Sequence, residues 1–293
     1  MPNIKRGMMA AAGAGGAPPP GVWTQVGNIE SVTPIDLAGL TSSQAAFVAS
    51  PFYLKTYNFD GTDWTQTGNS LTVTSSDNQR IIALTSSRIA WIDTNGDELR
   101  AYDWDGTDWT LTGSGLSISG LVGDIARLSS SRVSNVTYDD LTAYDFDGSS
   151  WSSVGSSLSI SPSISNPSCC ALSSTRIVVM ATSDQLRAYD FDGSNWTQTG
   201  NTTTITPLSY ADVARLSSDT FALYYAIGFS DQSYIIKYFF DGTDFSVIDA
   251  SYSGITAAYS NRIASLATIG EDASRVVTAA GTAITRTFDF VLD

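Results

Sequence analysis

One short sequence motif recurs along this chain at a constant spacing. A Leu-[Ser/Thr]-Ser tripeptide begins at Leu40, Leu84, Leu128, Leu172 and Leu216, and each copy starts 44 residues after the previous one. A looser copy, Leu266-Ala267-Thr268, follows near the C-terminus. A fixed period of this length indicates one structural unit that is stacked repeatedly. The chain is therefore expected to fold as a repeat architecture.

A second repeated segment has the pattern of a β-hairpin. The stretch AYDWDGTDWTLTG (101–113) joins two runs rich in aromatic residues and Thr through Asp-Gly, a favoured pair in tight hairpin turns. Close copies begin at Tyr57, Ala143 and Ala188, and a more divergent copy begins at Tyr238. One whole unit therefore predicts four short strands, at 80–86, 88–93, 98–105 and 109–118.

The two ends of the chain divide one unit between them. GVWTQVGN (21–28) matches only the last strand of a unit, whereas the C-terminal residues match the first three strands. Four strands in 40–50 residues are typical of a β-propeller blade. The sequence predicts an all-β, six-bladed β-propeller of four-stranded blades, in which the N-terminal strand 22–29 completes the last blade. An open β-solenoid is the alternative, but it leaves the divided unit unexplained.

Composition excludes several classes of function. The chain has no histidine, which removes Ser-His-Asp catalysis and histidine-containing zinc sites, and its two cysteines, Cys169 and Cys170, are adjacent. A net charge of −14 repels nucleic acid, and no apolar stretch is long enough for membrane insertion. No pair of carboxylates stands out as a glycosidase pair. We therefore predict a protein without enzymatic activity, cofactor or metal.

Three kinds of residue recur at equivalent positions in most of the repeated units. The aspartates of the Asp-Gly turns are expected to shape the hairpin, with weak Ca²⁺ binding as the alternative. The tryptophans that open the last strand are expected to pack between blades, with a glycan-stacking platform as the alternative. Arg88, Arg132, Arg176 and Arg275 are expected to bond to carbonyls or acids of an adjacent blade. A ring of these arginines that binds an anion in the central channel is the alternative.

The hairpin also resembles a motif of sialidase propellers. Asp-Gly-Thr-Asp-Trp is similar to the Asp-box, Ser-x-Asp-x-Gly-x-Thr-Trp, although the spacing of Asp and Gly differs. That box is structural in sialidases, so the resemblance implies no activity. Ligands of propellers bind through divergent loops, and two loops of this chain are longer than their equivalents, AIGFSDQSY (226–234) and IGEDAS (269–274). The first is rich in aromatic residues. We therefore take Phe229 and Tyr234 as candidate contacts with a partner.

Residues 1–20 differ in composition from the propeller at 21–293 and are expected to form an extended arm. This segment has Lys5, Arg6, Met8 and Met9, a Gly/Ala run and three prolines. A basic, apolar arm on an acidic body suits docking to a neighbouring subunit, so these four residues are candidate partner contacts. Its Gly/Ala run is too weakly apolar for a signal peptide.

The opening of the arm, MPNIKRGMMAAAGAGG, resembles structural proteins of marine tailed bacteriophages, and repeats such as FDGTDWTQTGN resemble phage propellers. These resemblances imply a location in the virion, as a capsid or tail accessory protein. Its arm would bind other virion structural proteins, and its propeller would serve assembly or adhesion to a host-surface glycan. The alternative is a carbohydrate-binding propeller, because six-bladed fucose-type lectins repeat at this length and use aromatic residues and arginines between blades.

Overall fold

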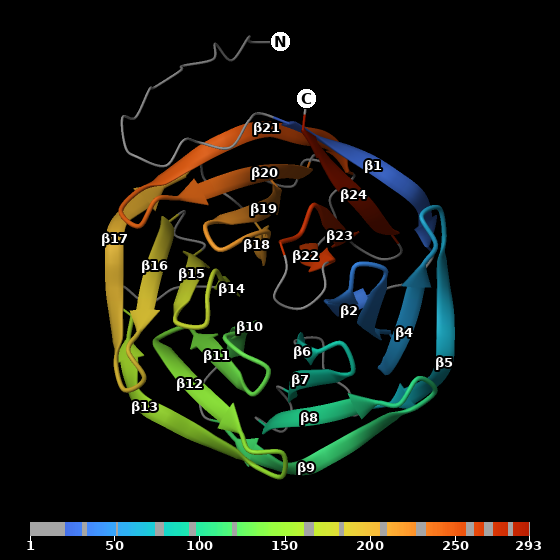
Figure 1. The fold of residues 1–293 in the computed structure, drawn as a ribbon, viewed down its shortest axis with the longest axis horizontal. Helices are drawn as coiled ribbons and strands as arrows, with labels where there is room; N and C mark the ends of the chain where they lie inside the picture. Colours follow the sequence, from blue (N-terminus) through green and yellow to red (C-terminus); the bar gives the residue numbers. More distant parts are fainter. Residues whose placement is uncertain are drawn as a thin grey trace.

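The computed structural model is a ring of six β-sheets around a central axis (Figure 1). It describes residues 21–30, 34–50, 52–73, 79–93, 98–118, 122–160, 167–181, 185–205, 210–226, 233–255, 261–266, 272–280 and 284–292. The arm at 1–20 lies outside the described residues. No helix in the described part of the chain has the length and apolar character to cross a bilayer.

Each sheet is one blade of four antiparallel strands. Blade 1 has β2 (Pro34–Thr41), β3 (Gln44–Ala49), β4 (Tyr53–Phe59) and β5 (Trp64–Thr72). Blade 2 has β6 (Arg80–Thr85), β7 (Arg88–Asp93), β8 (Glu98–Trp104) and β9 (Trp109–Ser117). Blade 3 has β10 (Val122–Arg127), β11 (Arg132–Thr137), β12 (Asp140–Phe146) and β13 (Trp151–Ser159).

The other three blades repeat this plan. Blade 4 has β14 (Ser168–Ala171), β15 (Arg176–Ala181), β16 (Gln185–Phe191) and β17 (Trp196–Thr204). Blade 5 has β18 (Tyr210–Arg215), β19 (Thr220–Ala226), β20 (Ser233–Phe240) and β21 (Phe245–Ile255). Blade 6 has β22 (Asn261–Leu266), β23 (Arg275–Ala280), β24 (Ile284–Leu292) and β1 (Gly21–Glu30).

The ring closes through the first strand of the chain, as the sequence predicts. Strand β1 pairs antiparallel with β24, in a register that runs from Gly21 opposite Leu292 to Val26 opposite Thr287. The N-terminal strand therefore supplies the outer edge of a blade whose other strands come from the C-terminus. The prediction of a six-bladed propeller closed by strand 22–29 is confirmed.

Position in the blade decides how much of each strand is buried. The first strands of the six blades surround the axis, and the fourth strands lie at the rim (Figure 1). The second strand of blade 2, RIAWID, is buried on both faces after its first residue, whereas WTLTGSGLS of the fourth strand buries only Trp109 fully. A strand covered on both faces has to be apolar throughout, which explains why strict alternation is absent from β7.

The hydrophobic core lies between blades. Each of the six clusters of buried side chains combines residues from two neighbouring sheets. Trp109, for example, comes from blade 2 and packs with Ala46, Val48 and Leu54 of blade 1. The tryptophans that open the fourth strands are therefore inter-blade packing residues, as expected. Trp64, Trp109, Trp151 and Trp196 are each 3–5 % exposed.

A hydrogen bond secures two of these tryptophans to the preceding blade. The indole Nε1 of Trp109 donates to Thr56 Oγ1 at 2.8 Å, and Trp64 makes the same bond to Thr287. The equivalent partners of Trp151 and Trp196 are Ala101 and Ala143, which offer no acceptor. Both indole nitrogens are buried without a hydrogen bond.

The rim carries a second set of inter-blade contacts. Gly113, with φ of +70°, lets β9 bulge toward the next blade, where Ser114 N donates to Ser149 O at 2.8 Å. A Cβ atom on Gly113 would lie 2.2 Å from that carbonyl oxygen. Only glycine permits both the positive φ and the close approach.

We predict that T56A lowers the free energy of unfolding by about 1–3 kcal/mol, because it leaves the buried Trp109 indole N–H without an acceptor. Chemical denaturation monitored by tryptophan fluorescence measures the change. The matched control is T65A, on the exposed side of β5, which should change stability by less than about 0.5 kcal/mol. Equal losses in the two variants would contradict the role of the indole hydrogen bond.

Candidate functional site

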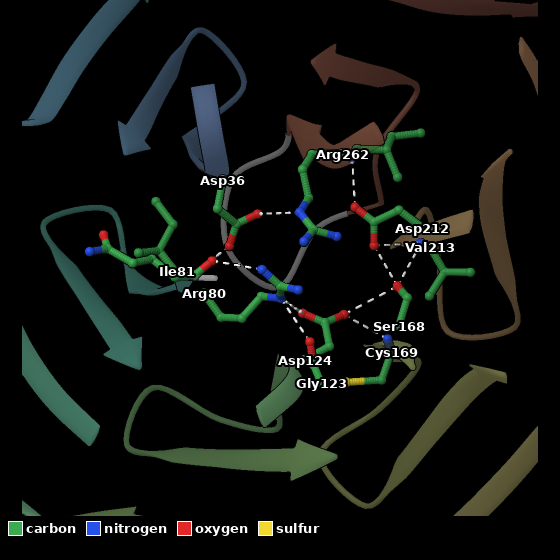
Figure 2. A network of polar contacts seen from close by, with 12 residues as sticks. Asp36, Arg80, Ile81, Gly123, Asp124, Ser168, Cys169, Asp212, Val213 and Arg262 are labelled. Carbon is green, nitrogen blue, oxygen red and sulfur yellow. Dashed lines mark hydrogen bonds and ion pairs between the residues drawn. The ribbon is translucent and has the colours of Figure 1, made fainter. Parts of the chain in front are cut away.

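Six polar side chains meet on the propeller axis, one from the first strand of each blade. Figure 2 shows them as a connected network. Each lies four residues before the leucine of a repeated Leu-[Ser/Thr]-Ser motif, or of its looser copy at Leu266. The six residues are Asp36, Arg80, Asp124, Ser168, Asp212 and Arg262. We call these six residues the axial ring. The axial ring was not predicted from sequence, because its residue type changes from blade to blade.

The axial ring joins every blade to the next. Asp36, Asp124 and Asp212 each accept the backbone N–H of the following blade, from Ile81 at 2.7 Å, Cys169 at 2.7 Å and Ile263 at 2.8 Å. Ser168 Oγ accepts Val213 N at 3.1 Å, and Arg80 Nε donates to Gly123 O at 2.7 Å. Arg262 completes the circle, with its Nε 3.5 Å from Asp36 Oδ1.

Burial favours the protonated form of two carboxyl groups in this ring, those of Asp36 and Asp124. It raises the pKa of Asp36 to about 6, against the opposing attraction of Arg262 and Arg80. Burial, reinforced by the charge of Asp212, raises the pKa of Asp124 to about 7. The geometry favours a proton at the same place, because Ser168 Oγ lies within hydrogen-bond distance of both Asp124 and Asp212. The single hydroxyl proton of Ser168 can be donated to only one of the two carboxyl groups. A proton on Asp124 would provide the second hydrogen bond, donated from the Asp124 carboxyl to Ser168 Oγ.

A cavity of about 120 Å³ follows the axis beside the ring. Asp36, Asp124 and Asp212 line it at one level. Three residues further along the inner strands, the lining residues at a second level are Gly39, Ala83, Arg127, Ala171, Arg215 and Ser265. The channel thus has an acidic level and a level with two arginines.

The repeated arginines of the second strands lie elsewhere, at the blade interfaces. Arg132 Nε and Nη2 donate to Asp145 Oδ1 and Oδ2 at 2.6 and 2.7 Å, and the guanidinium carbon lies 5.6 Å from the centre of the Phe191 ring of blade 4. The same arrangement recurs three times, in Arg88–Asp103 over Phe146, Arg176–Asp190 over Phe240 and Arg275–Asp289 over Phe59. We call these four groups the interface pairs.

This geometry corrects the expectation for the arginines. Their acidic partner belongs to the same blade, on the neighbouring strand, and the adjacent blade contributes an aromatic ring. The lining of the axial cavity includes none of the four. The hydrogen bonds from Arg88 hold the pKa of Asp103 below its usual value. These pairs remain open to solvent, since the side chains of Arg132 and Asp145 are 29 % and 36 % exposed.

The Asp-Gly turns have the structural role that the sequence predicts. Asp105 Oδ1 accepts the backbone N–H groups of Thr107 and Asp108, each at 2.7 Å, and these bonds lower the pKa of Asp105. The same two bonds recur at Asp60, Asp147, Asp192 and Asp241. The described residues include no cluster of three acidic or sulfur ligands that could hold a metal ion. Weak Ca²⁺ binding stays an untested alternative.

Of the candidate contacts, only Tyr234 is described. It is partly buried on β20, and its ring stacks on that of Tyr225 with centroids 5.2 Å apart. Phe229, Lys5, Arg6, Met8 and Met9 lie outside the described residues. Cys169 and Cys170 are buried free thiols, and burial raises the pKa of both.

Comparisons with known proteins support the fold. No protein-family model and no curated protein sequence matches the chain. Among solved structures, the β-propeller domain of Cps50 from Myceliophteria thermophila matches with a TM-score of 0.60 and 10 % identity, over 93 % of this chain and 100 % of that one.

Two of the other matching structures come from AofleA and from a fucose-specific lectin. AofleA from Arthrobotrys oligospora gives a TM-score of 0.60 and 11 % identity, over 94 % of this chain and 90 % of that one. The six-bladed lectin of Aleuria aurantia, whose structure shows how it recognises fucose, gives a TM-score of 0.59 and 14 % identity, over 91 % of this chain and 96 % of that one. At these identities the likeness concerns the propeller fold.

The raised pKa values in the axial ring predict an unusual pH dependence. A carboxyl whose pKa is higher in the folded than in the unfolded chain stabilises the fold at low pH, and this stability is lost as pH rises through the folded value. Between pH 5.5 and 7.5, the free energy of unfolding should therefore fall by on the order of 1–2 kcal/mol. Urea denaturation at the two pH values measures it.

The variant D124N should remove most of this slope, because it deletes the group whose pKa is about 7. The control D139N makes the same change of charge at an exposed residue of the same blade and should keep the slope. A D124N slope equal to that of the unmodified protein would refute the assignment to the axial ring and point to general charge repulsion.

Proposed function

We propose that this protein is a carbohydrate-binding propeller that holds sugar hydroxyls at the interface pairs. The observation that carries the proposal is the repetition of one half-exposed arginine–aspartate pair at four equivalent blade interfaces. Several equivalent sites on one rigid ring suit the recognition of a repetitive glycan surface, because linked weak sites gain avidity.

The chemistry of a pair matches that of neighbouring sugar hydroxyls. A sugar hydroxyl both donates and accepts hydrogen bonds. It can therefore accept from an N–H group of a guanidinium and donate to a carboxylate that lies beside it. Arg132 uses Nε and Nη2 for Asp145, which leaves Nη1 outside the pair. The bidentate contact and the Phe191 ring beneath hold the guanidinium in place, so little entropy is lost when a sugar binds.

The comparisons support the choice of the sugar to test first. Structures of similar fold include lectins in complex with fucosides, among them SapL1 with α-methyl fucoside. They also include an AofleA variant in which three arginines are replaced by alanine. A fucoside is therefore the first probe, although this chain shares only 15 % identity with SapL1. The absence of enzymatic activity stays a prediction.

A location in the virion is a separate proposal, which rests on the N-terminal resemblance and on the basic arm of an acidic protein. It is compatible with carbohydrate binding, since a particle that displays this propeller would adhere to host glycans.

Binding of α-methyl fucoside, measured by calorimetry, should show about four equivalent sites per chain, one for each interface pair. R132Q should lower the number of sites by one and leave the affinity of the others unchanged, because each pair acts alone. The control R100Q removes the arginine of the Arg100–Glu98 pair, which is similarly exposed but is not an interface pair, and should retain every site.

If the fucoside does not bind, a glycan array extends the test to other sugars. The proposal fails if no sugar on the array binds, or if R132Q and R100Q have the same effect. Melting temperatures of both variants show whether the fold survives. Loss of a half-exposed ion pair should cost at most about 1 kcal/mol.

For the virion proposal, mass spectrometry of purified particles should detect the chain. Protease added before and after disassembly should cleave residues 1–20 only after disassembly, since a docked arm is shielded. Absence of the chain from particles, or cleavage in both samples, would contradict the anchor.

A further inference from the structure

The second level of the axial cavity brings together two arginines from blades that are not neighbours. Arg127 ends β10 of blade 3, Arg215 ends β18 of blade 5, and Ala171 lies between them on blade 4. We propose that Arg127 and Arg215 form a binding site for a small oxyanion in the central channel. This site is independent of carbohydrate binding at the interface pairs.

Arg127 has a charge that the described residues do not neutralise. It is partly buried and forms no ion pair with any carboxylate in the described part of the chain. Burial and the nearby charge of Arg215 both lower the pKa of Arg127. A partly buried cation beside a like charge is unfavourable, and a bound anion would relieve both penalties.

Arg215 contacts a backbone carbonyl and a carboxylate of the two neighbouring blades. Its Nε donates to Leu172 O at 3.2 Å, and its Nη2 lies 3.6 Å from Asp272 Oδ1. The side chain of Asp272 is 73 % exposed, so solvent screens this contact. Both residues line the same cavity, so an anion beside Arg127 would also lie near the charge of Arg215. Planar guanidiniums recognise carboxylate, sulfate and phosphate oxygens.

The acidic level does not prevent anion binding. It lies three residues away along each strand, or about 10 Å. The three carboxylates and two guanidiniums of the axial ring sum to a charge of −1, and a single proton brings the sum to zero. The pKa of Asp124, about 7, supplies that proton near neutral pH. Below pH 7 the axial ring therefore adds little net charge, and Arg127 remains a cation of the lining that no described carboxylate neutralises.

The cavity has room for such a ligand. A cavity of about 10–15 Å³ holds one water molecule, and this one measures about 120 Å³. The remaining positions of the level are occupied by small residues, Gly39, Ala83, Ala171 and Ser265. Sulfate and acetate are suitable probes, one tetrahedral and one planar.

Thermal unfolding in sulfate or acetate tests the proposal. Each anion is titrated up to about 10 mM at constant ionic strength, because general salting-in and salting-out effects need far higher concentrations. At least one should raise Tm along a saturating curve by about 2–4 °C. R127Q should abolish this rise, whereas R100Q should keep it.

Two further measurements keep the outcome decisive. Equilibrium dialysis of the unmodified protein with radiolabelled sulfate or acetate should show about one bound anion per chain. If R127Q does not fold, R127K retains the charge without the planar fork and should bind several-fold more weakly. R132Q should keep the anion-dependent rise although it loses a sugar site, so the two proposals fail separately.

The proposal is overturned if neither anion produces a saturating rise in Tm of the unmodified protein. It is also overturned if R127Q shows the same rise as the unmodified protein, or if uptake in dialysis increases without saturation.

Discussion

The docking of each blade on the next is the interaction on which this molecule depends. The apolar clusters combine side chains of neighbouring sheets, and the axial ring, the tryptophans and the rim bulges all form contacts across the same boundaries. A single four-stranded sheet of this kind has two apolar faces and cannot bury either alone. Stability is therefore a property of the closed circle, and β1 matters because it completes the outer edge of blade 6.

Docking also creates the surfaces on which function is proposed. An interface pair needs an arginine and an aspartate from one blade and an aromatic ring from the next, so it exists only where two blades meet. The axial cavity likewise has one wall from each blade. The proposed sugar sites thus depend on the repetition of one interface around the ring. The proposed anion site depends on the meeting of the inner strands at the axis.

The period of the chain was enough to predict the architecture, because residues that recur every 44 positions are those that every blade needs. Trp109 and the Asp105 turn belong to this class, and their roles followed from type and position. The axial ring escaped sequence analysis because its members share a place and not a residue type. The arginine at position 88 was placed on a strand correctly, but its partner could not be identified, since pattern alone does not distinguish an acid on the next strand from one on the next blade.

The variation at the axial position limits how such a propeller could have arisen from copies of one unit. Six identical blades with aspartate there would bring six negative charges together at a buried site, and six with arginine would bring six positive charges together. The observed order, Asp, Arg, Asp, Ser, Asp, Arg, alternates acidic residues with basic or neutral ones around the axis. Duplication of a blade therefore had to be followed by divergence at this one position, whereas the hairpins could remain nearly identical.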